Sequence, residues 1–186
     1  METFQAFPTE IFLNIFQLDL EKLRGACLEH IEQEESQTRS GREGSTQHRR
    51  FKNKDFEDAV RQMMDYIQVP DRPLKSFKID AWVNRNPPGA LNTSHNHDPF
   101  DWIYWSGVFY VDVPSNSGSI VFEDPRQNLV VSNDRKYLHG ARKDFSIIPS
   151  ENLMVMFPSW LYHRVEANNS DLTRTSISFN IYKVRY

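Results

Sequence analysis

The sequence predicts an α+β protein that is mainly β: a double-stranded β-helix, or jelly roll, with two N-terminal helices packed on one sheet. Apolar residues follow a helical period before Pro73 and an alternating pattern from there to the end of the chain. Turn-forming residues separate many short alternating segments, as expected of two packed antiparallel sheets. A length of 186 residues suits one hydrophobic core, so residues 1–186 are predicted to form a single domain.

Two helices and a loop are predicted before Pro73. Residues 19–35 and 55–67 each place apolar side chains at helical spacing with charged residues between them. Pro70 and Pro73 end the second helix, because proline lacks a backbone donor. Residues 36–53 lack an apolar period and hold several basic residues, which predicts a mobile polar loop.

Eight strands are predicted after Pro73, because short runs of alternating, β-branched and aromatic residues lie between turn signals such as N-P-P-G and P-S-N-S-G. The predicted strands are Lys75–Asn84, Trp102–Val113, Ser119–Glu123, Leu129–Val131, Phe145–Ile148, Leu153–Phe157, Tyr162–Glu166 and Thr173–Tyr182. Strands that follow two helices in this way are typical of a jelly roll with helices outside one sheet.

Composition excludes several classes of protein. The chain has 22 Lys+Arg against 25 Asp+Glu, so it lacks the basic excess that binding to nucleic-acid phosphates requires. Cys27 is the single cysteine, so neither an intramolecular disulfide nor a thiolate metal cluster can form. No apolar run approaches the about 18 residues of a membrane span, and the N-terminus lacks the bases of a signal peptide. We therefore expect a cytoplasmic protein without a membrane partner, and the charge balance does not indicate a nucleic-acid partner.

The stretch T-S-H-N-H-D-P, residues 93–99, holds three potential metal ligands within four positions: His95, His97 and Asp98. In an extended segment, residues two apart point the same way and lie about 6.7 Å apart at Cα, so the two histidines can face one ion. A third imidazole is available from His163, which ends F-P-S-W-L-Y-H. Imidazole ligands with open coordination positions suit an iron that must also bind a small ligand and dioxygen.

The last predicted strand has one polar and one apolar face. Alternation places Arg174, Ser176, Ser178 and Asn180 on the first face, and Thr175, Ile177, Phe179 and Ile181 on the second. A guanidinium inside a barrel is costly unless an anion is bound beside it. Arg174 and Ser176 are therefore candidates to hold one carboxylate of a dicarboxylic acid whose other end chelates the metal.

These residues resemble a known enzyme family. The order of His95, His163 and R-T-S at 174–176 is similar to that of the 2-oxoglutarate- and iron(II)-dependent dioxygenases. A closer resemblance, over nearly the whole chain, is to a small family of such oxygenases from bacteria and tailed phages. It rests on A-F-P-T-E-I near the start and on A-W-V-N, S-H-N-H, S-G-V-F-Y-V, G-S-I-V-F-E-D-P-R, F-P-S-W-L-Y-H-R-V and R-T-S-I-S-F-N.

The resemblance implies an oxidoreductase that uses Fe(II), 2-oxoglutarate and O2. It implies that His95 and His163 bind the metal and that Arg174 and Ser176 bind the 2-oxoglutarate carboxylate. The expected reaction is hydroxylation of a substrate C–H bond, with release of succinate and CO2. In a phage-encoded protein, the expected location would be the host cytoplasm.

Three further residues are candidates to contact the co-substrate. Tyr110 lies on the strand that, in the wider superfamily, often supplies a hydroxyl group to 2-oxoglutarate. Ser106 on the same strand and Asn180 on the last strand are weaker candidates for the same role.

Position 97 departs from the superfamily, which has Asp or Glu where this chain has His97. Three arrangements follow: a site of His95, His97 and His163; a site in which Asp98 supplies the third ligand; or two histidines with an open position, as in related enzymes that bind halide. Asp98 is one residue out of phase and needs a bulge to point inward, so alternation favours the three-histidine site. A neutral third ligand leaves one more positive charge on the metal.

Two other functions fit the same residues. One is a three-histidine jelly-roll metal dioxygenase that does not use 2-oxoglutarate, in which Arg174 has no part in turnover. The other is a non-catalytic jelly-roll binding or phage module, in which the metal is saturated by protein ligands. The sequence does not specify the primary substrate, because a fold does not specify one.

Overall fold

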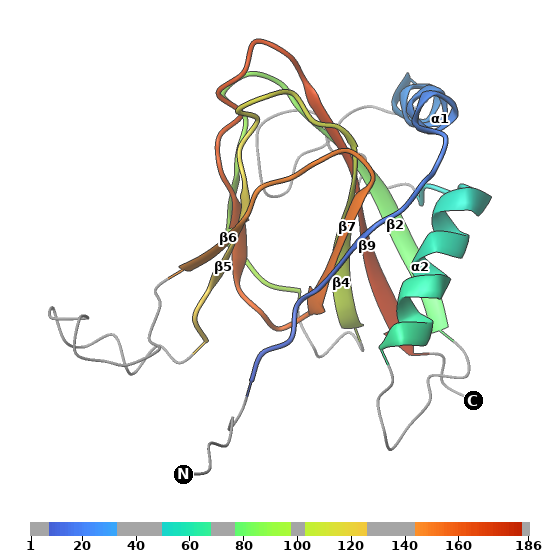
Figure 1. The fold of residues 1–186 in the computed structure, drawn as a ribbon, viewed down its shortest axis with the longest axis vertical. Coiled ribbons are helices and arrows are strands. Elements are labelled where there is room, and N and C mark those ends of the chain that lie inside the picture. Colours follow the sequence, from blue (N-terminus) through green and yellow to red (C-terminus); the bar gives the residue numbers. More distant parts are fainter. Residues whose placement is uncertain (1–7, 33–49, 68–76, 98–102, 126–143, 184–186) are drawn as a thin grey trace, which may run out of the picture.

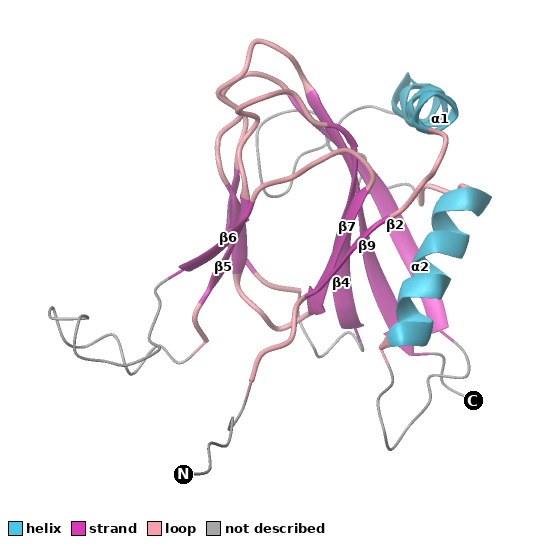
Figure 2. Cartoon of the chain, in the orientation of Figure 1, coloured by secondary structure: helices cyan, strands magenta, loops and turns pink. Residues whose placement is uncertain are grey.

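A computed structural model describes residues 8–32, 50–67, 77–97, 103–125 and 144–183. In this part of the chain, two antiparallel sheets lie face to face, and both helices pack on the outer face of the larger sheet (Figures 1 and 2). This arrangement confirms the predicted jelly roll with its helices on one sheet. No helix within the described residues is long and apolar enough to cross a membrane.

The larger sheet has the strand order β1-β7-β4-β9-β2, and the smaller sheet has the order β3-β8-β5-β6. The larger sheet consists of β1 (Phe12–Ile15), β2 (Phe77–Asn86), β4 (Ile103–Asp112), β7 (Leu153–Pro158) and β9 (Arg174–Lys183). The smaller sheet consists of β3 (Asn92–His95), β5 (Ile120–Glu123), β6 (Asp144–Ile147) and β8 (His163–Val165). Each predicted strand within the described residues appears, with ends shifted by at most two residues; Leu129–Val131 lies outside them.

Two strands, β1 and β3, were not predicted. Each has four residues and lies at the edge of its sheet. Strand β3 also changes register against β8 between Asn92 and His95. Such short edge strands carry too few alternating positions to stand out in a sequence, so tertiary pairing decides them.

The helices α1 (Leu20–Glu32) and α2 (Lys54–Tyr66) form the outer core with the larger sheet. Helix α2 begins after Asn53, whose side chain accepts a hydrogen bond from the Phe56 amide at 3.1 Å. The Phe56 ring centroid lies 6.2 Å from that of Phe109 on β4 and 5.6 Å from that of Phe179 on β9. Aromatic packing therefore fixes α2 across the middle of the sheet.

The end of the predicted mobile loop is part of this core. Phe51 is 2% exposed, and its backbone N–H donates to the carbonyl of Ala81 on β2 at 2.7 Å. A single phenylalanine within a polar segment has no apolar period, so the sequence did not assign it to the core. Residues 36–49 of that predicted loop lie outside the described residues.

The space between the two sheets is filled unevenly. One part is apolar, with Val108, Phe122, Val155, Phe157 and Leu161 among its buried residues. The other part receives the polar face of β9, as predicted from alternation. The jelly roll therefore leaves room for a polar site between its sheets, while the outer core carries most of the apolar packing.

Candidate metal centre

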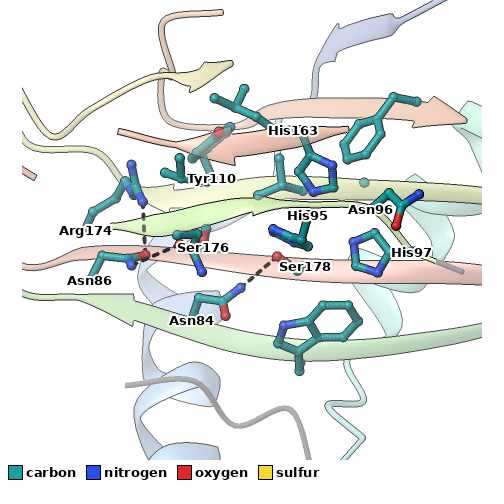
Figure 3. A pocket seen from close by; sticks show the side chains of 17 residues that line it. Asn84, Asn86, His95, Asn96, His97, Tyr110, His163, Arg174, Ser176 and Ser178 are labelled. Carbon is teal, nitrogen blue, oxygen red and sulfur yellow. Dashed lines mark hydrogen bonds between the residues drawn. The ribbon is translucent and has the colours of Figure 1, made fainter. Parts of the chain in front are cut away.

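A cavity of about 220 Å³ opens between the two sheets. It is lined by side chains from β2, β4 and β9 on one side and from β3 and β8 on the other. The three predicted histidines lie at one end of it, and Arg174 lies at the other end (Figure 3).

The histidines come together because β3 pairs with β8. His95 ends β3 and lies directly opposite His163, the first residue of β8. His97 follows β3, where its backbone N–H donates to the carbonyl of Ser159 at 2.9 Å. One potential ligand atom from each of the three histidines lies within 4.8 Å of the others.

Backbone carbonyls orient two of the three imidazoles. The Nδ1 atom of His95 lies 2.7 Å from the Thr93 carbonyl oxygen, and Nδ1 of His163 lies 3.0 Å from the Leu161 carbonyl oxygen. A carbonyl only accepts, so each Nδ1 carries the proton and donates. The Nε2 lone pairs of His95 and His163 are then available to a metal ion.

The buried imidazoles are uncharged at neutral pH. Burial and, to a smaller extent, the neighbouring His95 lower the pKa of His97 to about 4. Burial likewise lowers the pKa of His163 to about 3, again with a contribution from His95. Neutral imidazole is the form that binds metal, so the cluster need not release protons from these two rings.

The donor set fits a divalent iron. Three imidazole nitrogens suit Fe(II), and also Ni(II), Cu(II) and Zn(II), and they leave coordination positions open for small ligands. Of the three predicted arrangements, the structure assembles the set of His95, His97 and His163. Asp98, the alternative ligand, lies outside the described residues.

Arg174 is a buried cation at the far end of the cavity. Its side chain is 1% exposed and donates to the carbonyls of Ser117 and Gly118 and to Asn86 Oδ1 at 2.8 to 3.1 Å. Its Nε atom is buried without a hydrogen-bond partner, and no carboxylate of the described residues pairs with the guanidinium. Burial lowers the pKa of Arg174, as expected of an uncompensated cation. An anion bound in the cavity would supply the missing partner.

Two hydroxyl groups lie next to this cation. Tyr110 on β4 and Ser176 on β9 are register partners, and both line the cavity. Burial raises the pKa of Tyr110 to about 12, although the nearby Arg174 guanidinium lowers it. Tyr110 therefore stays protonated at neutral pH and can donate to an anion.

The weaker candidates Ser106 and Asn180 lie elsewhere. The Ser106 hydroxyl donates to Asn180 Oδ1 at 2.8 Å, and Asn180 Nδ2 lies 3.5 Å from His97 Nδ1. Neither side chain lines the cavity as the described residues define it. The structure thus places this pair behind a histidine, away from Arg174.

Sequence reasoning missed the amide groups of β2. Asn84 donates to Ser178 Oγ at 2.7 Å, and Asn86 accepts from Arg174 at 3.0 Å. Trp82 forms the adjoining wall, with its ring centroid 6.1 Å from that of His97. The signal was present in W-V-N-R-N, where the large or polar residues recur at a period of two.

Fold and site together define a class: a jelly-roll metalloprotein whose histidine cluster faces a buried anion-binding group. A family model described as "Putative 2OG-Fe(II) oxygenase" matches residues 80–180, more than half of the chain. The chain therefore belongs to the 2OG-Fe(II) oxygenase family. It is accordingly a 2-oxoglutarate-dependent oxidoreductase that uses Fe(II), 2-oxoglutarate and O2.

Solved structures of other enzymes share the fold. A Pseudomonas putida prolyl-4-hydroxylase superimposes with a TM-score of 0.67 at 14% identity, covering 95% of this chain and 94% of that one. HygX from Streptomyces hygroscopicus, with nickel and 2-oxoglutarate bound, gives 0.63 at 9% identity, covering 95% and 86%. SnoK, a carbocyclase from nogalamycin biosynthesis, gives 0.59 at 13% identity, covering 93% and 79%. A search of curated proteins found no match.

Proposed function

We propose that the protein is an Fe(II)- and 2-oxoglutarate-dependent hydroxylase whose metal is held by His95, His97 and His163. One observation carries the proposal: a single cavity joins a cluster of imidazoles to a buried guanidinium that has no carboxylate partner among the described residues. A dicarboxylic oxo acid complements both ends, because one end chelates a metal and the other is a carboxylate. We also propose that residues 1–186 form one oxygenase domain, since both cores share the larger sheet.

The residues of the chain position the co-substrate. Three contacts occupy three of the five N–H donors of Arg174, which leaves Nε and one further N–H for a carboxylate. Ser176 and Tyr110 add hydroxyl donors beside it. Charge-assisted bonds of this kind hold the far carboxylate in one orientation. Bound Fe(II) supplies the activation of O2 that converts 2-oxoglutarate to succinate and CO2 and hydroxylates a C–H bond.

The cavity also limits the primary substrate. Apart from the histidines and Arg174, the described lining residues are neutral, with Trp82, Asn84 and Asn96 among them. Among the described residues that line it, none is a carboxylate that could pair with a cationic group. We therefore propose that the part of the substrate that reaches the metal is uncharged. The cytoplasmic location stays a prediction.

Anaerobic reconstitution tests the proposal. Addition of Fe(II) and then 2-oxoglutarate to the wild-type protein should produce a weak visible charge-transfer band. The band should be lost in His163→Ala and kept in His30→Gln, which changes a histidine of α1 outside the cavity. An iron-loaded wild-type protein without the band would overturn the proposal.

Oxygen consumption separates this function from the three-histidine alternative. With 2-oxoglutarate as the co-substrate, Arg174→Ala should lower both O2 uptake and succinate formation at a fixed, low 2-oxoglutarate concentration. If uptake of O2 continues unchanged in Arg174→Ala and no succinate forms in the wild type, the enzyme does not use the oxo acid.

A further inference from the structure

Ser106 and Asn180 form a buried polar pair directly behind His97. They are register partners on β4 and β9, and their side chains are 1% and 5% exposed. The Ser106 hydroxyl donates to Asn180 Oδ1 at 2.8 Å, and the Asn180 amide nitrogen lies 3.5 Å from His97 Nδ1. The pair is thus held in the larger sheet and reaches His97, which is the member of the three-histidine cluster that lies outside a strand.

His97 differs from the other two imidazoles in what its Nδ1 meets. Carbonyl oxygens of Thr93 and Leu161 accept from Nδ1 of His95 and His163, respectively. For His97, the partner of Nδ1 among the described residues is the side-chain amide of Asn180. Asn180 therefore occupies the place that a backbone carbonyl fills for the other two rings.

The orientation of this amide decides which nitrogen of His97 can bind a metal. If the amide N–H donates to Nδ1, the ring proton of neutral His97 is on Nε2, and Nε2 cannot bind a metal. If the amide is turned over, Oδ1 accepts from Nδ1–H, and the Nε2 lone pair becomes available. The turned amide donates through Nδ2 to the Ser106 hydroxyl, which can rotate to accept.

Both orientations fill the same space, because the amide oxygen and nitrogen of asparagine are nearly equal in shape. The present N···N distance of 3.5 Å is longer than the roughly 2.9–3.0 Å of a well-formed hydrogen bond, so the contact as drawn is weak. In the turned orientation, His97 Nδ1–H donates to Asn180 Oδ1 in an N–H···O bond and Asn180 Nδ2 donates to the Ser106 hydroxyl, so both contacts pair a donor with an acceptor.

We propose that Asn180, held by Ser106, is the positioning residue that fixes His97 as an Nε2 metal ligand. The proposal rests on the proposed three-histidine site and extends it to the support of the third ligand. Because both the Asn180 amide and the His97 imidazole are neutral, the third ligand and its supporting group add no charge to the metal site. Hydrogen-bond acceptors behind metal-bound histidines orient the ring, and their loss typically lowers metal affinity about 10- to 100-fold.

Metal affinity gives the first measurement, with Co(II) as the probe and its visible absorption as the signal. Asn180→Leu, which removes the acceptor at similar volume, should weaken Co(II) binding about 10- to 100-fold. Asn180→Asp should restore wild-type affinity or exceed it, because a carboxylate accepts from both Nδ1–H and Ser106. The control is Thr175→Val, on the opposite face of β9 and outside the cavity lining, which should leave affinity unchanged.

Proton NMR of the Co(II) protein gives a second measurement that a merely structural role would not change. Ring N–H protons of cobalt-bound histidines shift far downfield and are visible when a hydrogen bond protects them from exchange. The wild type should show three such exchangeable signals. Asn180→Leu should lose one of them and Asn180→Asp should keep all three.

The outcomes separate this inference from the proposed ligand set. Two exchangeable signals in the wild type, together with unchanged Co(II) affinity in His97→Ala, would show that His97 is not a ligand and would overturn both. Three signals that persist in Asn180→Leu, with affinity unchanged, would leave the ligand set intact and overturn the role of Asn180. Melting temperatures of the metal-free variants account for any effect on folding.

Discussion

The two faces of β9 are both largely buried and have opposite roles. On the outer face, Ile177, Phe179 and Ile181 are 0% exposed and pack beneath the helices. On the inner face, Arg174 and Asn180 are 1% and 5% exposed, yet they are polar. The outer face is satisfied by apolar contacts alone, whereas the inner face leaves the Arg174 Nε donor unpaired. Burial by itself therefore does not distinguish the core from the site; here the inner face differs because it presents polar side chains to a cavity.

The largest expected effect is on the outer face. Phe179→Ala should lower the free energy of unfolding by about 3–5 kcal/mol, because it removes a fully buried ring that packs on Phe56. Urea denaturation monitored by circular dichroism measures the change. Co(II) affinity of the folded fraction should stay at the wild-type value; a parallel loss of affinity would show that the two faces are not separate.

On the inner face, a substitution should lower ligand affinity more than it lowers stability. Arg174→Met should weaken 2-oxoglutarate binding about 100-fold, because truncation of one member of a buried charge pair costs about 2–5 kcal/mol. Its effect on unfolding should be smaller than that of Phe179→Ala. Isothermal titration with 2-oxoglutarate under anaerobic conditions measures the affinity.

Arg164→Met is the matched control for Arg174. Arg164 lies on β8, where its side chain is 34% exposed and bonds Asp144 at 3.0 Å. Affinity for 2-oxoglutarate should be unchanged in this variant. Equal losses in both variants would point to net charge rather than to a specific contact of Arg174.

A smaller effect on stability is expected at Gly107, where β4 lies close to Phe179 of β9 and to the backbone of β7. Gly107→Ala on β4 would place a Cβ 2.4 Å from Phe179 Cζ and 2.8 Å from the Val155 carbonyl oxygen. The clash should cost about 1–3 kcal/mol of unfolding free energy. Phe179→Leu should relieve only part of this cost, since the Val155 carbonyl belongs to the backbone. Full recovery in the double variant, measured as a double-mutant cycle, would contradict the backbone contribution.

The smallest effect concerns Cys27 on α1 in the outer core. Burial and, to a smaller extent, the nearby Asp112 raise the pKa of its thiol from 9.0 to about 12. Between these values the folded chain keeps the proton that the unfolded chain releases, so stability falls as pH rises above 9. The slope in the wild type should exceed that in Cys27→Ala by up to about 1.4 kcal/mol per pH unit.

Urea denaturation of both proteins between pH 8 and pH 10.5 compares the slopes. Other groups that titrate in this range are present in both proteins and cancel in the difference. Equal slopes would mean that the Cys27 thiol reaches solvent in the folded state.

Periodicity predicted most of the fold and of the candidate site. Alternation assigned Arg174 and Ser176 to the interior and Phe179 to the core, and the structure places them so. It also put His95 and His97 on one side of the chain, where the structure brings them together with His163. The assignments on β9 succeeded because side-chain direction in a strand depends only on local geometry. His97 lies beyond the end of β3, so its place beside His95 depends on the path of the chain there.

The assignments that failed depended on partners distant in the sequence. Strand β1 exists because β7 pairs with it, and Phe51 packs in the outer core, where its amide donates to the Ala81 carbonyl. Asn180 was assigned to the correct face, but its contact with His97 follows from the path of the chain beyond β3. No local pattern encodes such contacts, because each joins segments that meet only in the folded chain.

The sequence by itself determined the class of fold, the family and the residue types of the site, since these follow from period, motif and composition. Only the tertiary structure decided that Arg174 lies without a carboxylate partner in the described chain and that Asn180 stands behind His97. The physical reason is that alternation fixes which face of the sheet a side chain occupies. Only the pairing of strands in the folded protein fixes which other residues contact that side chain.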